Sequence, residues 1–365
     1  MSTQRLKVVI DRESAYDIRV GTSLLASLGV HTREVSAATK AVVITDDNVG
    51  PQYLSKVKAS LSEGGFEVFD LTVPAGEGSK SIEVATELWE ALVMLGIGRD
   101  ALIVGLGGGV VGDLAGFVAS TYMRGVDYVQ VPTSLLAMVD SSIGGKTAIN
   151  LGAGKNLVGT FWQPRYVLAD LKTLDTLPAV ERENGFAEIA KSALLDGEEP
   201  CRLLMDDAEA LLAHAESATQ QAIVRSLSLK ARVVAADVRE KGQRVCLNYG
   251  HTFAHALEAV SGYRISHGRA VAEGMRFAAR LAIEAAGAPE SLAEAQAILL
   301  DGLGLASIAE PFSADELHAR MFSDKKVRND ELRFVFVTAP GQWKVVAVDP
   351  DLVKIYLILW EQERM

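Results

Sequence analysis

Short apolar runs alternate with amphipathic segments through the first half of the chain. Runs rich in Val, Ile and Leu that end in turn-forming residues predict β-strands at residues 6–12, 41–48, 66–73, 101–109, 128–134 and 166–171. Residues 51–65 and 82–96 carry apolar positions three and four residues apart, which predicts helices. Strands that alternate with helices indicate a largely parallel sheet with helices on both faces.

The pattern changes after Pro178 to Ala-, Leu- and Glu-rich segments with helical spacing. These segments cover residues 179–195, 199–215, 219–237, 251–260, 268–287 and 291–304. Residues 332–340 and 343–350 predict a small hairpin, and residues 358–365 predict a last helix. A chain of 365 residues exceeds what one hydrophobic core usually supports. We therefore expect an α/β protein with a parallel-sheet domain over residues 1–176 and a mainly α-helical domain over residues 177–365.

Composition argues against some kinds of partner and indicates the compartment of the protein. A formal charge of −11 argues against non-specific nucleic-acid binding, which needs a basic surface. No apolar run approaches the roughly 20 residues that span a bilayer, and the first residues lack the apolar segment of a signal peptide, so we expect a cytoplasmic protein. The two cysteines, Cys201 and Cys246, lie far apart and predict no disulfide.

A glycine-rich turn follows the predicted strand at residues 101–109. Gly107, Gly109 and Gly112 satisfy the spacing of a dinucleotide-binding loop, in which backbone amides at a helix N-terminus approach a pyrophosphate. The pattern alone is weak, because this is not the first strand–helix unit of the fold. A tight crossover without a ligand is the alternative, and Asp113 would then only complement the helix dipole.

Residues 141–164 are rich in Gly and Ser and show little periodic apolar character. They contain Lys146, Lys155 and Asn156 and follow Asp140. We expect a binding loop rather than a framework element, with lysines acting as point charges on a phosphate. A solvated loop without a ligand is the alternative.

Three of the six histidines fall within the 21 residues from Leu247 to His267. His251 and His255 are four residues apart and share a helix face, while His267 follows the Gly262 break. Neutral imidazole is a common zinc ligand, so the cluster predicts a metal site, with two incidental histidines as the alternative. Glu188 supplies a carboxylate. Two histidines and one glutamate leave open positions, as catalytic zinc sites do.

Six segments together resemble the 3-dehydroquinate synthase family, in order over nearly the whole chain. They are residues 107–121, 124–150, 154–164, 187–191, 239–258 and 267–275. The resemblance implies a homodimeric sugar-phosphate cyclase of the shikimate pathway, a lyase. It also implies a Rossmann-like N-terminal domain, a helical C-terminal domain, an active site between them, bound NAD and a divalent metal, usually zinc or cobalt.

The resemblance assigns roles residue by residue. It implies that Glu188, His251 and His267 bind the metal, whereas His255 lies near the substrate phosphate and Glu240 is a proton acceptor beside it. Arg124 matches an arginine lent to the partner subunit, and Lys325 and Lys326 match a phosphate-binding Asp-Lys-Lys segment. The other residues that match substrate-holding positions are Asp140, Lys146, Lys155, Asn156, Lys191, Lys230, Arg244 and Asn248.

The resemblance also implies a set of NAD-contacting residues, three of which it shares with the substrate group. These are Asp46, Asn48, Glu77, Lys80, Gly108, Gly109, Val110, Asp113, Thr133, Ser134, Asp140, Lys146, Lys155 and Thr173. Spacing alone would instead assign the carboxylate that binds the NAD ribose to a position near Asp127. Two small departures, Val238 where the family usually has Glu and Ala254 where Gly is common, remove no group on which these assignments depend.

The family converts 3-deoxy-D-arabino-heptulosonate 7-phosphate into 3-dehydroquinate by transient oxidation, phosphate elimination, re-reduction and aldol closure. Two enzymatic alternatives stay open: a metal-dependent polyol dehydrogenase, and a sister cyclase acting on sedoheptulose 7-phosphate or an amino sugar. A non-catalytic NAD-binding regulator is a third. Asn248, His255 and the Asp-Lys-Lys segment favour the dehydroquinate branch, because sister cyclases tend to differ at these positions.

Overall fold

The computed structural model describes residues 3–10, 15–323 and 332–365. The chain divides into two compact units, the first comprising Met1–Pro178 and Lys230–Arg239, the second Ala179–Leu229 and Glu240–Met365. Within the described ranges, no helix is both long and apolar enough to cross a membrane.

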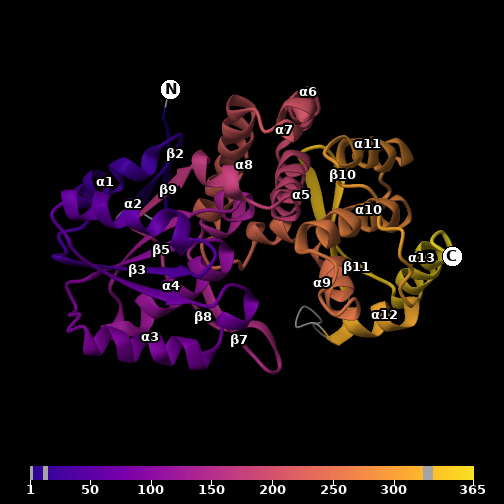
Figure 1. Ribbon diagram of the computed structural model, residues 1–365. Helices are drawn as coiled ribbons and strands as arrows, with labels where there is room; N and C mark the ends of the chain where they lie inside the picture. Colours follow the sequence, from indigo (N-terminus) through magenta and orange to yellow (C-terminus); the bar gives the residue numbers. More distant parts are fainter. Residues whose placement is uncertain (1–2, 11–14, 324–331) are drawn as a thin grey trace. The chain divides into compact units, whose positions relative to one another are not determined.

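The first unit is built on a seven-stranded sheet in the order β1-β2-β9-β6-β5-β3-β4 (Figure 1). The strands are β1 (Gln4–Val9), β2 (Ala15–Gly21), β3 (Lys40–Asp46), β4 (Glu67–Val73), β5 (Leu102–Gly107), β6 (Asp127–Pro132) and β9 (Tyr166–Asp170). Strand β1 pairs antiparallel with β2, and all other pairings in this sheet are parallel. The predicted largely parallel sheet is therefore confirmed, although β2 was not predicted.

Both faces of the sheet are covered, which explains the continuous apolar runs. On β3, Val42 and Ile44 pack with α3 (Ile82–Met94) and α4 (Gly109–Thr121), whereas Ala41 and Val43 pack with α1 (Leu28–Val35) and α2 (Gly50–Glu63). The helices after β3 and β5 thus lie on opposite faces. The adjacent carboxyl ends of these two strands form the switch point where open α/β sheets bind ligands.

The segment at residues 141–164 is largely a hairpin, so the prediction that it is a loop was wrong, while its predicted binding role stays a prediction. It contains the antiparallel hairpin β7 (Lys146–Leu151) and β8 (Gly154–Phe161). Thr147 is buried against α4, where a Cβ on Gly116 would lie 2.4 Å from its Cγ2. Strand β8 is mostly exposed and lacks alternation, so the pairing depends on tertiary contacts that a local pattern does not reveal.

The second unit consists of helices and one hairpin. The helices are α5 (Ala179–Asp196), α6 (Glu198–Asp206), α7 (Ala208–Leu212), α8 (Glu216–Ala236, whose last turns belong to the first unit), α9 (His251–Val260), α10 (His267–Ala286), α11 (Glu290–Gly302), α12 (Ala314–Ser323) and α13 (Pro350–Gln362). The predicted hairpin is present as β10 (Leu332–Ala339) and β11 (Gln342–Val348).

The helical half differs from the prediction in three places. The single helix predicted at residues 199–215 is two helices, α6 and α7, separated at Asp207. Helix α12 was not predicted, and α13 begins eight residues before the predicted last helix, at Pro350 rather than residue 358. The described residues also include short 3-10 helices and one π segment, η4: η1 (Leu24–Ser27), η2 (Glu77–Ser79), η3 (Tyr122–Arg124), η4 (Ala137–Ser141), η5 (Leu171–Thr176) and η6 (Gln243–Asn248).

Helix α10 is central in the second unit, and its apolar face packs on aromatic side chains. The Phe277 ring stacks on Phe253 of α9 with centroids 4.7 Å apart, and Phe253 meets Trp360 of α13 edge-on at 5.2 Å. Phe334 of the hairpin lies 6.3 Å from Phe277. Aromatic clusters of this kind bury large apolar areas and fix helix positions.

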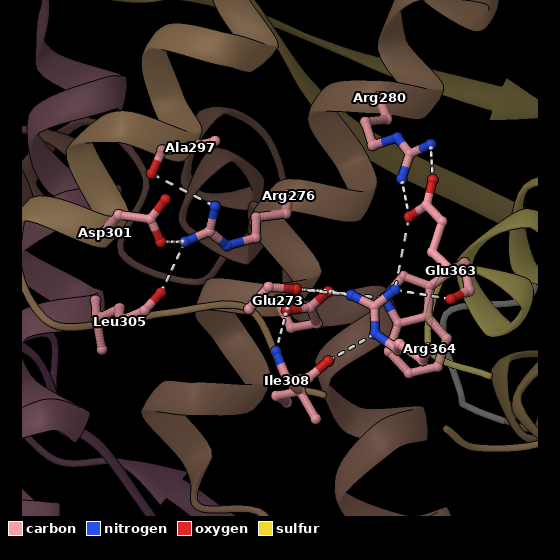
Figure 2. Close-up of polar contacts among 11 residues, drawn as sticks. Glu273, Arg276, Arg280, Ala297, Asp301, Leu305, Ile308, Glu363 and Arg364 are labelled. Carbon is pink, nitrogen blue, oxygen red and sulfur yellow. Dashed lines mark hydrogen bonds and ion pairs between the residues drawn. The ribbon is translucent and has the colours of Figure 1, made fainter. Parts of the chain in front are cut away.

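A buried ionic network joins α13 to α10 (Figure 2). The Glu273 carboxylate, 2% exposed, accepts hydrogen bonds from Arg364 Nη2 at 2.5 Å, Trp360 Nε1 at 2.7 Å and the Ile308 amide at 3.1 Å. Burial lowers the pKa of Arg364, and the charge of Glu273 opposes that shift. This carboxylate therefore holds three segments of the second unit together.

We predict that Glu273→Ala destabilises the protein strongly, because it leaves the Arg364 guanidinium, with 8% of its side chain exposed, without its main counter-charge. The free energy of unfolding should fall by about 3 kcal/mol, measured by urea denaturation followed by circular dichroism. Asp206→Ala is the control, since its pair with Arg202 is about 60% exposed and should contribute less than about 1 kcal/mol. Equal effects of the two substitutions would contradict the prediction.

Candidate metal centre and nucleotide loops

Three predicted site residues from three helices of the second unit converge. The Glu188 Oε1 atom lies 3.7 Å from His251 Nε2 and 3.7 Å from His267 Nε2. One ligand atom from each residue lies within 4.8 Å of the others, and the imidazole centroids are 5.6 Å apart. The structure thus brings together a carboxylate and two imidazoles that are distant in sequence.

The N-terminus of α10 is fixed against α5, which places His267 beside Glu188. The side-chain oxygen of Asn184 on α5 accepts a hydrogen bond from the Gly268 amide at 2.7 Å, while Ser266, the N-cap of α10, makes no capping bond of its own. A Cβ on Gly268 would lie 2.3 Å from the Asn184 Cα, so only glycine allows this approach. The cap from α5 replaces the usual local cap.

Further contacts orient the two imidazoles. His251 Nδ1 lies 3.1 Å from the Tyr249 carbonyl oxygen, and His267 Nδ1 lies 3.6 Å from Glu258 Oε2. Acceptors beside Nδ1 favour the tautomer that carries its proton on Nδ1 and leaves the Nε2 lone pair facing Glu188. Metal sites in which a carboxylate or carbonyl supports each histidine have this arrangement.

The electrostatics of the cluster suit a cation. Glu188 is 2% exposed, and neither of its oxygens accepts a hydrogen bond from any described residue, although Lys191 lies within ion-pair distance of Oε2. Burial alone would lower the pKa of His267, but the carboxylates of Glu188 and Glu258 outweigh it and raise that pKa to about 10. A field that binds a proton this tightly also attracts a divalent metal, so the donor set fits zinc or cobalt.

The other described residues predicted for the second unit lie in α5, in α9 and in or just before η6. The His255 ring is 5.5 Å from His251, is exposed, and is not part of the three-residue ligand group found among the described residues. Asn248 Nδ2 donates to Glu240 Oε1 at 3.0 Å. Arg244 and Lys191 are each 2% exposed. Lys325 and Lys326 lie outside the described residues.

Four predicted residues of the first unit contact one another around an ammonium group. Lys80 Nζ lies 2.7 Å from Asp113 Oδ2, 2.5 Å from Asn156 Oδ1 and 3.7 Å from Glu77 Oε1. Lys80 is only 4% exposed, and its charge opposes the rise that burial causes in the pKa of Asp113. Side chains from η2, α4 and β8 thus meet at one point.

The carboxyl ends of neighbouring strands bear the remaining nucleotide residues. Gly108 is the N-cap of α4 and makes no side-chain cap, so the first amides of this helix suit a phosphate group. A Cβ on Gly108 would lie 3.4 Å from Ser134 Oγ, whereas one on Gly112 would lie 2.2 Å from Gln130 Nε2. Gly112 therefore serves close helix–strand packing, and the amides near Gly108 fit a dinucleotide.

Three more predicted residues of this group form hydrogen bonds with backbone groups of the first unit. Asp46 Oδ1, at the end of β3, accepts from the amides of Asn48 at 2.9 Å and Val49 at 2.8 Å. Thr133 donates its amide to the Gly107 carbonyl at 2.9 Å. Thr173 is 1% exposed and its hydroxyl donates to the Asp170 carbonyl at 2.8 Å.

Lys230 lies in the part of α8 that belongs to the first unit, and there it contacts Asp140. Its Nζ donates to both the backbone oxygen and Oδ1 of Asp140, each at 2.6 Å. Lys146, Lys155 and Arg124 are exposed. Sequence reasoning missed the supporting residues Asn184 and Glu258, because a cap supplied by another helix and a contact behind a ligand leave no local signal.

Comparison with known proteins gives concordant results. Residues 70–184 match the family model described as 3-dehydroquinate synthase N-terminal, and residues 185–327 match the one described as 3-dehydroquinate synthase C-terminal. The chain is 43% identical to a 3-dehydroquinate synthase of Symbiobacterium thermophilum over 343 residues, which cover 93% of this chain and 95% of the relative.

Two solved structures are similar throughout. A 2-deoxy-scyllo-inosose synthase complexed with carbaglucose-6-phosphate, NAD⁺ and Co²⁺ superposes with a TM-score of 0.90 and 27% identity, covering 97% of this chain and 99% of that one. The 2-epi-5-epi-valiolone synthase of Streptomyces hygroscopicus, with NAD⁺ and Zn²⁺ bound, gives a TM-score of 0.86 and 27% identity, covering 98% and 99%.

We predict that binding of Zn²⁺ or Co²⁺ to the metal-free chain releases about one proton at pH 8, because His267 with a pKa of about 10 is then protonated and must lose its proton to become a ligand. The apparent affinity should rise about tenfold per pH unit from pH 7 to 9. Calorimetry in buffers of different ionisation enthalpy measures the release. His267→Ala should abolish both effects, and metal binding without proton release in the unaltered chain would contradict the prediction.

Proposed function

The chain belongs to the 3-dehydroquinate synthase family, and from this premise we propose which of its residues perform the family's reaction. That reaction converts 3-deoxy-D-arabino-heptulosonate 7-phosphate into 3-dehydroquinate and inorganic phosphate. It involves NAD and a divalent metal, with no net oxidation of the substrate. The observation that carries the assignment of residues is the meeting of Glu188, His251 and His267.

The second unit binds the metal through Glu188, His251 and His267. A bound zinc or cobalt ion supplies a Lewis acid that lowers the pKa of a substrate hydroxyl. Three protein ligands leave positions for substrate oxygens. Glu258 and the Tyr249 carbonyl hold the two imidazoles in the ligating tautomer, and Lys191 limits the negative charge of Glu188.

The first unit binds the nucleotide. Bound NAD would supply a group that can both accept and donate a hydride. The α4 amides after Gly108 hold the pyrophosphate, and the side chains at the ends of β3 and β6 orient the rest of the dinucleotide. Lys80 neutralises Asp113 and so lets this carboxylate stay close to the phosphate-binding amides.

Cationic residues accept the phosphate as it leaves. Lys146, Lys155, Lys230 and Arg244 supply charge and hydrogen-bond donors, which stabilise the negative charge that develops on the departing group. The segment with Lys325 and Lys326 belongs to the same group. His255, Glu240 and Asn248 position substrate hydroxyls and move protons, so no strong protein base is needed if the phosphate itself removes the proton.

The same proposal includes a homodimer that acts in the cytoplasm as a carbon–oxygen lyase. Arg124 lies in η3, has a left-handed backbone with φ of 69°, and is exposed. A cation presented in this way suits a phosphate held by a partner subunit. The resemblance noted above for Arg124 supports this arrangement.

A sister cyclase is the second candidate, since both solved structures described above are cyclases with other products. Asn248 and His255 favour the dehydroquinate reaction. Higher identity to a 3-dehydroquinate synthase, 43% against 27%, points the same way.

We expect the purified chain with NAD and Zn²⁺ to release inorganic phosphate from the heptulosonate phosphate without accumulating NADH. Hydride leaves and returns within one turnover, so the NADH absorbance should stay flat while a phosphate assay rises. Sedoheptulose 7-phosphate, tested beside it, should give little phosphate. Steady growth of NADH would instead favour a polyol dehydrogenase, and preference for the sedoheptulose substrate would favour a sister cyclase.

Replacing Arg124 with Ala should mainly raise KM, by about tenfold or more, because one charge-assisted phosphate contact is lost while the metal ligands are intact. Steady-state kinetics measure the change, and sedimentation checks that the oligomer is unaltered. Arg165→Ala is the matched control, since this exposed arginine pairs with Asp127. An unchanged KM in the Arg124 variant would refute the role.

A further inference from the structure

Asn150, which the sequence did not single out, contacts three of the nucleotide and substrate residues. Its Nδ2 donates to Glu77 Oε1 at 2.8 Å, and its Oδ1 accepts from the Asn156 amide at 2.8 Å. Its backbone amide donates to the Lys80 carbonyl at 2.7 Å. The side-chain amide therefore links η2 to the hairpin β7–β8.

The position of Asn150 in the hairpin makes these bonds possible. The register between β7 and β8 is regular up to Ile149–Val158 and shifts before Leu151–Gly154. Asn150 falls at this irregularity, so its amide is directed to Lys80 rather than into the ladder. A β-bulge commonly re-aims a side chain in this way beside a functional site.

The bonds form a closed ring. Asn156, with a left-handed φ of 53°, presents its Oδ1 to Lys80 Nζ at 2.5 Å, and the same ammonium contacts Asp113 at 2.7 Å. Loss of Asn150 would release both Glu77 and the Asn156 backbone. Lys80 would then lose the support that aims it.

We propose that Asn150 is a positioning residue that preorganises the nucleotide site through Glu77 and Asn156 without contacting NAD. This inference rests on the proposed function, because it assumes that the ring serves NAD binding. Because the ring is already ordered, NAD binding does not include the entropic cost of ordering two loops. Asn150 therefore affects the affinity for NAD more than the turnover rate.

The test uses the full-length chain with Asn150→Leu, which keeps the side-chain volume but removes both polar groups. The dissociation constant for NAD should rise about tenfold, the effect of losing roughly one net hydrogen bond, while kcat at saturating NAD stays within about twofold. Hydrogen exchange should become faster in residues 76–80 and 152–156. Val158→Ala, on the facing strand, is the matched control and should bind NAD like the unaltered chain.

A double-variant cycle separates positioning from general stability. If Asn150 acts largely through Glu77, then Asn150→Leu should weaken NAD binding much less in a Glu77→Ala background. Full additivity overturns the inference, as does an NAD dissociation constant within twofold of the unaltered value in Asn150→Leu, or in Asn150→Ala if the Leu variant does not fold. If the unaltered chain bound no NAD, the proposed function would fail, whereas the exchange data would still show whether Asn150 orders the two loops.

Discussion

The burial of the Glu188 carboxylate is the constraint on which the second unit depends. A charge that is 2% exposed loses most of its hydration, a cost of several kcal/mol unless other groups compensate. The compensating groups come from its own helix, from the start of α9 and from the start of α10. Packing of these three helices therefore also assembles the metal ligands.

The first unit solves a different problem. Some of its polar residues lie at the ends of parallel strands, and others lie in η2, in α4 and on the β7–β8 hairpin. Support comes from the ring around Lys80, in which each polar group is a partner of the next. The polar contacts of this ring order segments that are not ordered by a pattern of apolar residues.

The sequence was informative where physical signals are local. Strands β3, β5 and β6 and helices α9 and α10 follow directly from apolar spacing, because burial and periodicity agree there. Helical spacing paired His251 with His255, and residue chemistry added Glu188 and His267 as candidate ligands, but only the family resemblance excluded His255 from the ligand set. The hairpin β7–β8 and the contacts of Asn184 and Asn150 were not predictable, since they depend on residues far away in the chain.

One consequence follows from the short segment Lys230–Arg239, which belongs to the first unit although 51 residues of the second precede it. Lys230 gives Asp140 its ammonium partner. During synthesis, the N-terminal sheet can form early, but the first unit is complete only after residue 239 has left the ribosome. The nascent protein must therefore begin both halves before it can finish either, which couples their maturation in time.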